Sequence, residues 1–218
     1  MPERKEREIE TRGVSRRRFM ALGGGSAAAA AFLAACGDDD GMTTTTMGAS
    51  GRGSDETAQF GKGDVGILNY ALTLEYLETA FYAEVVKSGL FEGGDLETIR
   101  KFGSEEAQHV AALTAAVKEL GGKPAPKPKT EFPLESAKTV LELAGTVENL
   151  GAAAYLGQAA NIESPEVLAS ALAIHSVEGR HAATLNTLLG QSITPDGAFA
   201  KPADVKSVLK SVEPFIVG

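Results

Sequence analysis

The sequence is poor in several residue types on which common folds and sites depend. Its 218 positions include one cysteine, no tryptophan, three histidines and only 6% aromatic residues. A single cysteine excludes an internal disulfide framework and a metal site built from several thiolates. Few aromatic residues and abundant alanine suit closely packed helices better than a β-sandwich, so we expect an all-α fold.

Basic residues are scarce outside the N-terminal segment. The formal net charge is −8, yet residues 1–35 hold seven Lys/Arg and four Asp/Glu, which leaves 14 basic and 25 acidic residues in the rest of the chain. No basic stripe remains to neutralise phosphates, so we do not expect nucleic acid as a partner.

The N-terminal segment carries the features of an export signal. Residues 15–20, Ser-Arg-Arg-Arg-Phe-Met, resemble the twin-arginine export motif of bacteria. The apolar run 19–35 is short and rich in glycine, which suits a signal better than a spanning helix. Residues 33–36, Leu-Ala-Ala-Cys, resemble a lipobox, in which Cys36 is lipidated and becomes the mature N-terminus. The alternative is an ordinary signal whose cleavage site contains a cysteine.

These observations predict four segments and a location. We expect a signal over residues 1–36, a flexible Gly-, Asp-, Thr- and Ser-rich linker over 37–60, a helical bundle over 61–190, and a C-terminal extension with a short helix over 191–218. The protein would be exported and held at a membrane of the cell envelope by its lipid anchor.

Apolar residues recur at helical spacing in four long stretches. The expected helices cover residues 63–87, 95–120, 134–161 and 165–189, and a shorter one covers 202–211. Asp95 and Ser164 are the expected caps, and Gly89, Gly121 and Gly190 the expected stops. The proline-rich residues 123–128 cannot be helical. About 12 extended residues reach roughly 40 Å, so the second and third helices can lie parallel, joined by a long crossover.

The two halves of the bundle repeat one polar pattern on otherwise apolar helices. The pattern is a Glu, a Tyr seven residues later, and then Glu-x-x-His on the following helix. It occurs at Glu75, Tyr82, Glu106 and His109, and again 73 or 72 residues later at Glu148, Tyr155, Glu178 and His181.

This spacing predicts a site for two metal ions. Residues three or seven apart share a helix face, so each Glu-x-x-His presents an oxygen and a nitrogen on one side of its helix. Four carboxylates and two imidazoles from four facing helices can hold two ions, with two carboxylates bridging the metals and two capping them. Such ligands suit iron(II) and manganese(II) and leave positions open for dioxygen or peroxide. The alternative is a plain bundle with these residues on its surface.

Three stretches also resemble a known family. Residues 68–82, 148–157 and 178–182 resemble the first, third and fourth helices of the bacterial ferritin-like domain family, in the wider group of bacterioferritin and rubrerythrin. The resemblance spans about residues 62–190. It implies a ferritin-like four-helix bundle with two iron or manganese ions held by the six residues Glu75, Glu106, His109, Glu148, Glu178 and His181.

Several other positions compete for a role. Glu78 can replace Glu75 as the ligand of the first helix, and Glu142 can replace Glu148. Glu105 lies about 100° round the helix from Glu106 and is expected to face solvent. His175 is either a supporting partner or a packed or surface residue. The tyrosines Tyr82 and Tyr155 either hydrogen-bond the ligating carboxylates or are core aromatics with exposed hydroxyls.

The leading hypothesis for function is a membrane-tethered dimetal protein with oxidase or peroxidase-type chemistry. Oxidation of iron(II) and disproportionation of peroxide, as by a catalase, both suit the expected site, and no residue is singled out as catalytic. The alternative is a non-catalytic metal-binding or structural envelope lipoprotein.

Overall fold

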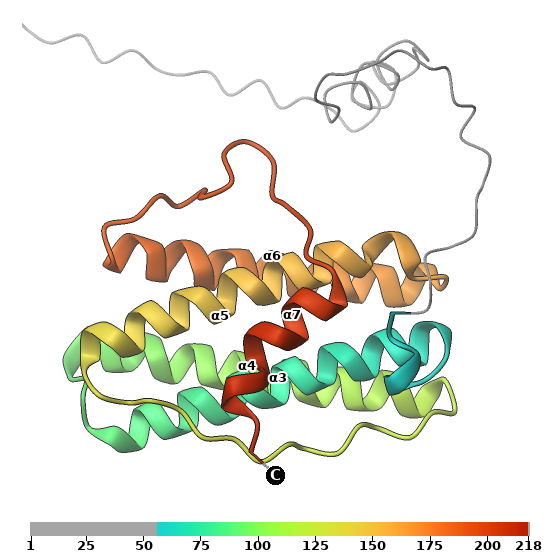
Figure 1. The fold of residues 1–218 in the computed structure, drawn as a ribbon, viewed down its shortest axis with the longest axis horizontal. Coiled ribbons are helices and arrows are strands. Elements are labelled where there is room, and N and C mark those ends of the chain that lie inside the picture. Colours follow the sequence, from blue (N-terminus) through green and yellow to red (C-terminus); the bar gives the residue numbers. More distant parts are fainter. Residues whose placement is uncertain (1–55, 218) are drawn as a thin grey trace, which may run out of the picture. The chain divides into compact units, whose positions relative to one another are not determined.

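The computed structural model describes residues 56–217, which are almost wholly helical (Figure 1). This part of the chain forms the long helices α3 (Gly63–Ser88), α4 (Gly93–Glu119), α5 (Ala137–Gln158) and α6 (Pro165–Leu188), the short α7 (Val205–Val212), and three 3-10 turns, η1 (Ala58–Phe60), η2 (Ala159–Asn161) and η3 (Glu213–Phe215). The predicted all-α class is confirmed. No helix among residues 56–217 is long and apolar enough to cross a membrane.

The predicted N-terminal features lie mostly outside the described residues. The signal over 1–36, its Cys36 and most of the linker precede residue 56. The last part of the predicted linker is described, and there η1 forms a short turn next to α3 with Thr57 buried. The structured region therefore begins before the predicted boundary at residue 61.

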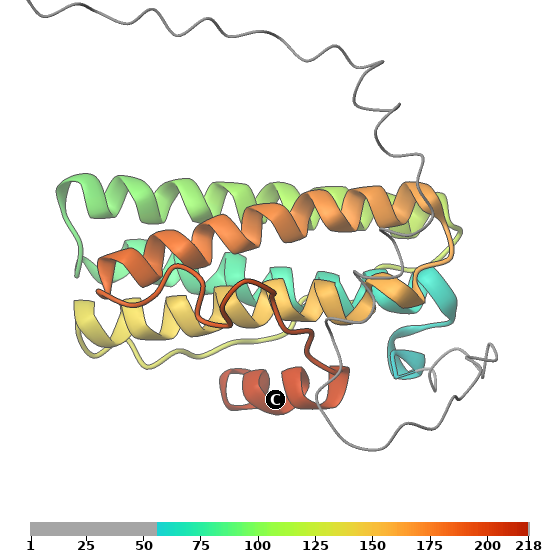
Figure 2. The same ribbon diagram turned by 90° about the horizontal axis from the view of Figure 1, so that it is seen from above.

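A long crossover joins the two halves of the bundle. Helices α3 and α4 form one antiparallel pair, and α5 and α6 form another. Between the pairs, residues 122–136 run back along the bundle, so that α4 and α5 point the same way (Figures 1 and 2). This is the predicted crossover. Its middle is fixed by an antiparallel bridge between Thr130 and Ile216.

Most helix ends follow the predicted signals. Gly89 closes α3 in the left-handed conformation, with φ of 71°. The Ser164 side chain accepts a hydrogen bond from the Val167 N–H at 3.2 Å, and Pro165 occupies the first helical position. The prediction for Asp95 is wrong, because the cap of α4 is Glu92 and Asp95 lies in the first turn. There its negative charge interacts favourably with the N-terminal end of the helix dipole, although its side chain does not cap the helix.

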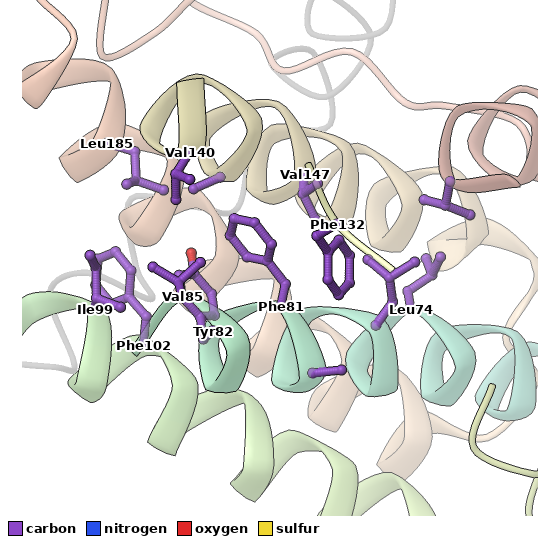
Figure 3. Close-up of a cluster of buried hydrophobic side chains, with 14 of the residues drawn as sticks. Leu74, Phe81, Tyr82, Val85, Ile99, Phe102, Phe132, Val140, Val147 and Leu185 are labelled. Carbon is purple, nitrogen blue, oxygen red and sulfur yellow. The ribbon is translucent and has the colours of Figure 1, made fainter. Parts of the chain in front are cut away.

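The hydrophobic core fills the space between the paired helices and the crossover (Figure 3). Phe81 on α3 meets Phe132 of the crossover edge-to-face, with ring centroids 5.2 Å apart. Tyr82 and Phe102 meet in the same manner at 5.9 Å. Such aromatic pairs prefer particular distances and orientations, so the first pair positions the crossover on α3 and the second positions α4 against α3.

The C-terminal extension packs on α5. Helix α7 buries Val205, Val208 and Val212, and the backbone N–H of Ala203 donates to the carbonyl of Ala153 at 2.9 Å. A Cβ atom added at Gly157 would lie 2.0 Å from the carbonyl oxygen of Ala203. The chain at Ala203, which we call the strap, therefore approaches α5 so closely that position 157 requires glycine.

Gly157→Ala is expected to destabilise the protein by about 1–3 kcal/mol, the usual cost of overpacking, because the strap at Ala203 must move. Gly179→Ala is the matched control, since a Cβ there meets nothing within 4 Å on α6. The control should gain about 0.5–1 kcal/mol from helix propensity. Urea unfolding followed by circular dichroism measures both, and equal shifts for the two variants would contradict the expectation.

Candidate metal centre

The four long helices bring the six predicted ligands together in the middle of the bundle. Two groups of side chains have ligand atoms that all lie within 4.8 Å of one another. The first group is Glu75, Glu106, His109 and Glu178, and the second is Glu106, Glu148, Glu178 and His181. Each group contains one imidazole and three carboxylates, and Glu106 and Glu178 belong to both.

In the first group, His109 is the central contact. Its Nδ1 lies 2.9 Å from Oε2 of Glu106, 3.2 Å from Oε2 of Glu75 and 3.3 Å from Oε1 of Glu178. These carboxylates come from α4, α3 and α6. The His109 side chain is 11% exposed and the three carboxylate side chains are at most 1% exposed, so this group is closed to bulk water except near the imidazole.

The second group has the same form around His181. Its Nδ1 lies 2.8 Å from Oε1 of Glu106 and 3.2 Å from Oε2 of Glu148. The equivalence of the two groups follows the sequence repeat: exchanging the halves of the chain exchanges Glu75 with Glu148 and His109 with His181. The repeat is therefore expressed in space as an approximate two-fold arrangement.

The repeated tyrosines link the two halves reciprocally. The hydroxyl of Tyr82 on α3 donates to Oε1 of Glu148 on α5. The hydroxyl of Tyr155 on α5 donates to Oε1 of Glu75 on α3, at 2.5 Å. Burial raises the pKa of both tyrosines, and their carboxylate partners raise it further, so both remain hydrogen-bond donors at neutral pH. The tyrosine hydroxyls therefore bond the candidate ligands and are not exposed, which is the first of the two interpretations of the sequence.

The crowding of carboxylates changes the protonation of the imidazoles. Burial alone would lower the pKa of His109, but contacts with Glu106, Glu178 and Glu75 outweigh it and raise the pKa to about 12. The same opposition raises the pKa of His181 to about 11, through Glu106 and Glu148. Both imidazoles are therefore protonated at neutral pH in the metal-free protein.

The carboxylates divide into two kinds. Burial would raise the pKa of Glu106, but its close contacts with the two imidazoles, His109 first, lower it to about 2. Burial raises the pKa of Glu178 well above its usual value, and the charge of Glu75 adds to this. Burial also raises the pKa of Glu148. Glu106 is thus the carboxylate that remains ionised under all ordinary conditions.

Three buried carboxylate oxygens of the two groups have no hydrogen-bond partner among the described residues. They are both carboxylate oxygens of Glu178 and Oε1 of Glu106. Two of them lie close to imidazole nitrogens, yet their geometry is not that of a hydrogen bond. Since buried polar atoms without partners are costly, these shared carboxylates fit a role in which a cation supplies the missing contacts. Carboxylate oxygens and imidazole nitrogens are donors that can hold a divalent metal ion.

A comparison with family models decides the family. The model described as "ferritin-like domain" matches residues 63–191, more than half of the chain. The chain belongs to the ferritin-like domain family. A search of curated proteins gave no match. The match covers α3 to α6 and thus all six candidate ligands of this ferritin-like protein.

The structure also places the competing residues. Glu142 is 45% exposed and pairs with Lys138, away from the centre. The Nδ1–H of His175 donates to the carbonyl oxygen of Ala152 at 2.9 Å, and this contact involves no candidate ligand. Neither residue belongs to the two groups.

Glu78 lies beside the two groups without belonging to either. It is 2% exposed, and a Cβ added at Gly151 would lie 3.0 Å from its Oε1 and 3.1 Å from Oε2 of Glu178. Gly151 therefore leaves room for both carboxylates on this side of α5. Burial raises the pKa of Glu78 well above its usual value, and the charge of Glu178 adds to the shift, so its surroundings favour the protonated form.

The expectation for Glu105 is wrong. Its side chain is 28% exposed, and Oε2 lies 2.9 Å from Nε2 of His181 on α6. Because α4 and α6 lie side by side (Figure 2), a residue 100° from the ligand face of α4 reaches the neighbouring helix. The sequence distinguishes this residue from the repeat, because the position equivalent to Glu105 in the second half is Val177.

Proposed function

We propose that this ferritin-like protein binds two iron or manganese ions and uses them in redox chemistry with dioxygen or peroxide. The proposal rests on one observation: two overlapping groups of carboxylates and imidazoles share Glu106 and Glu178. A carboxylate that belongs to both groups would be a ligand shared by the two ions. Glu75 and Glu148 belong to one group each and would cap one ion each.

Charge supports two divalent ions. Four ionised carboxylates balance two divalent cations when both imidazoles are neutral ligands, and a fifth buried carboxyl, Glu78, adds no charge while it is protonated. Metal ligands must be deprotonated, so uptake would release the protons held by His109 and His181. In the metal-free protein, the protons on His109 and His181 supply part of the positive charge that bound metal ions would otherwise supply.

The chain's own groups prepare the site for this chemistry. Tyr82 and Tyr155 hold the capping carboxylates in place from the opposite helix. Such outer hydrogen bonds fix ligand geometry and tune affinity. Bound iron or manganese would supply the electrons that dioxygen or peroxide accepts. The shared carboxylates, with no exposed surface, would keep bulk water from the reacting positions.

Metal analysis and turnover assays test the proposal. Protein expressed without residues 1–36 and purified should contain two iron or manganese ions per chain by mass spectrometry, and the loaded protein should oxidise iron(II) or consume peroxide faster than buffer. Folded protein that takes up neither metal would overturn metal binding. Loaded protein with no turnover would favour the second candidate, a metal-binding protein without catalysis, and would contradict only the redox part.

The cellular part of the proposal is export and lipid anchoring at the cell envelope. It is supported by the motifs at residues 15–20 and 33–36, which precede the described residues. Metabolic labelling with a fatty-acid analogue is expected to mark the wild-type protein and not Cys36→Ala. Equal labelling of the two proteins, or of neither, would exclude the anchor at Cys36.

A further inference from the structure

The ring of His181 is held by two side chains of α4. Phe102 stacks on the imidazole, with centroids 4.0 Å apart and planes 28° from parallel. Glu105 accepts a hydrogen bond from Nε2 at 2.9 Å. With Nε2 donating to Glu105, the remaining nitrogen, Nδ1, faces Glu106 and Glu148. The ring is thus turned so that Nδ1, the nitrogen not bonded to Glu105, points into the centre.

The other half of the site has no such arrangement. The repeat offset of 72 that relates the two Glu-x-x-His motifs carries Phe102 to Ile174 and Glu105 to Val177. Neither residue can accept a hydrogen bond through its side chain. Within residues 56–217, the ion pairs of His109 all use Nδ1, and the side chain is 11% exposed against 3% for His181. The six candidate ligands follow the sequence repeat, but the residues that contact the outer side of each imidazole do not.

We propose that Glu105 makes the two metal positions unequal, so that the position at Glu148 and His181 binds its ion more tightly than the position at Glu75 and His109. The inference deepens the proposed dimetal function and depends on it. A carboxylate hydrogen-bonded to the outer nitrogen of an imidazole ligand fixes the ring and makes it a better donor, which is worth about 10–100-fold in metal affinity. Glu105 is therefore a positioning residue that acts through His181.

The surroundings of Glu105 suit this role. Lys101, one turn earlier on α4, pairs with Oε1 of Glu105, while Oε2 contacts His181. The two oxygens thus have separate partners, one toward solvent and one toward the centre. Lys101 is 67% exposed and contributes little by itself, since surface pairs are worth about 0–1 kcal/mol. The contact with the imidazole is the part that matters for metal binding.

A titration of the metal-free protein with manganese(II), followed by calorimetry, tests the inference. Wild type is expected to bind two ions in steps separated by about 10–100-fold in affinity. Glu105→Val introduces the residue found at the equivalent position of the other half. It is expected to lower the affinity of the tighter step to that of the weaker one. Glu105→Gln, whose amide oxygen still accepts the hydrogen bond, should recover part of the separation. Lys101→Ala is the matched surface control and should behave as wild type.

A crystal grown with one manganese equivalent locates the first ion through its anomalous signal. The ion should lie beside His181 in wild type and divide between the two positions in Glu105→Val. Two ions bound with equal affinity in wild type, or an unchanged separation in Glu105→Val, would overturn this inference and leave the dimetal centre standing. Failure of wild type to bind manganese or iron at all would instead overturn the proposed function.

Discussion

Glu178→Gln is expected to remove both metal ions, and Glu78→Gln is expected to leave both in place. Glu178 belongs to both ligand groups, so its loss deprives each ion of a carboxylate, whereas Glu78 belongs to neither. The affinity of both positions should fall by at least about 100-fold, the upper limit for the loss of an outer hydrogen-bond partner alone. Mass spectrometry of the purified variants gives metal content per chain, and circular dichroism reports whether the fold is kept.

The glutamine at position 78 is a close control because it changes little else. The carboxyl of Glu78 is 2% exposed and burial raises its pKa, so an amide of the same shape preserves the packing and resembles the protonated form that the site favours. Glu75→Gln completes the series and is expected to weaken chiefly the ion beside His109. If Glu78→Gln lost metal while Glu75→Gln kept it, Glu78 would be the ligand of α3, the alternative left open by the sequence.

The candidate ligands could be predicted because the repeat carries them at constant offsets. Glu-x-x-His and a Glu seven residues before a Tyr are spacings along single helices, and helix geometry alone places their side chains on shared faces. The crossover followed from the prolines of residues 123–128, which exclude helix, and from the length of chain available. Each of these inferences needs only local structure, and each agrees with the arrangement of the helices.

The features that escaped prediction depend on contacts between helices. The direction of Glu105 from α4 was right, but whether that direction leads to water or to His181 depends on where α6 lies. The exclusion of Glu142 depends on the exposure of its face of α5, beside Lys138. The role of Gly151 as the space for two carboxylates is likewise visible only when α3, α5 and α6 are packed. Sequence periodicity defines the faces of a helix, and the neighbours of each face come from the packing.

Removal of the metal is expected to lower the melting temperature by about 8–16 °C. A ligand at 1,000 times its dissociation constant stabilises the native state by about 4 kcal/mol, and a domain of 150–250 residues shifts by about 2–4 °C per kcal/mol. The metal-free site is poorly compensated, because it buries five carboxyl groups, at Glu75, Glu78, Glu106, Glu148 and Glu178, against two imidazoles. Differential scanning calorimetry with saturating manganese and with chelator measures the difference.

The difference in melting temperature between the manganese-loaded and the metal-free protein should widen as the pH rises from 6 to 8. His109 and His181 have raised pKa values, about 12 and 11, so their contribution to the stability of the metal-free protein is complete below about 6.5, the unfolded value, and is lost as the pH rises through the folded values. Burial raises the pKa of Glu75 to about 8, which also makes the metal-free protein less stable with rising pH above its unfolded value. Metal binding strengthens over this range because the protons displaced from the imidazoles are released into a solution of lower proton activity.

Glu178→Gln, scanned under the same conditions, separates these effects. Without a bridging carboxylate it should show no rise in melting temperature with manganese at any pH, while its metal-free form should still lose stability between pH 6 and 8 through the imidazoles. A wild-type difference that shrinks as the pH rises would mean that His109 and His181 are not protonated in the metal-free centre. In that case the imidazole protons would not balance the carboxylate charge in the metal-free protein, and the electrostatic argument for a site of two ions would be lost.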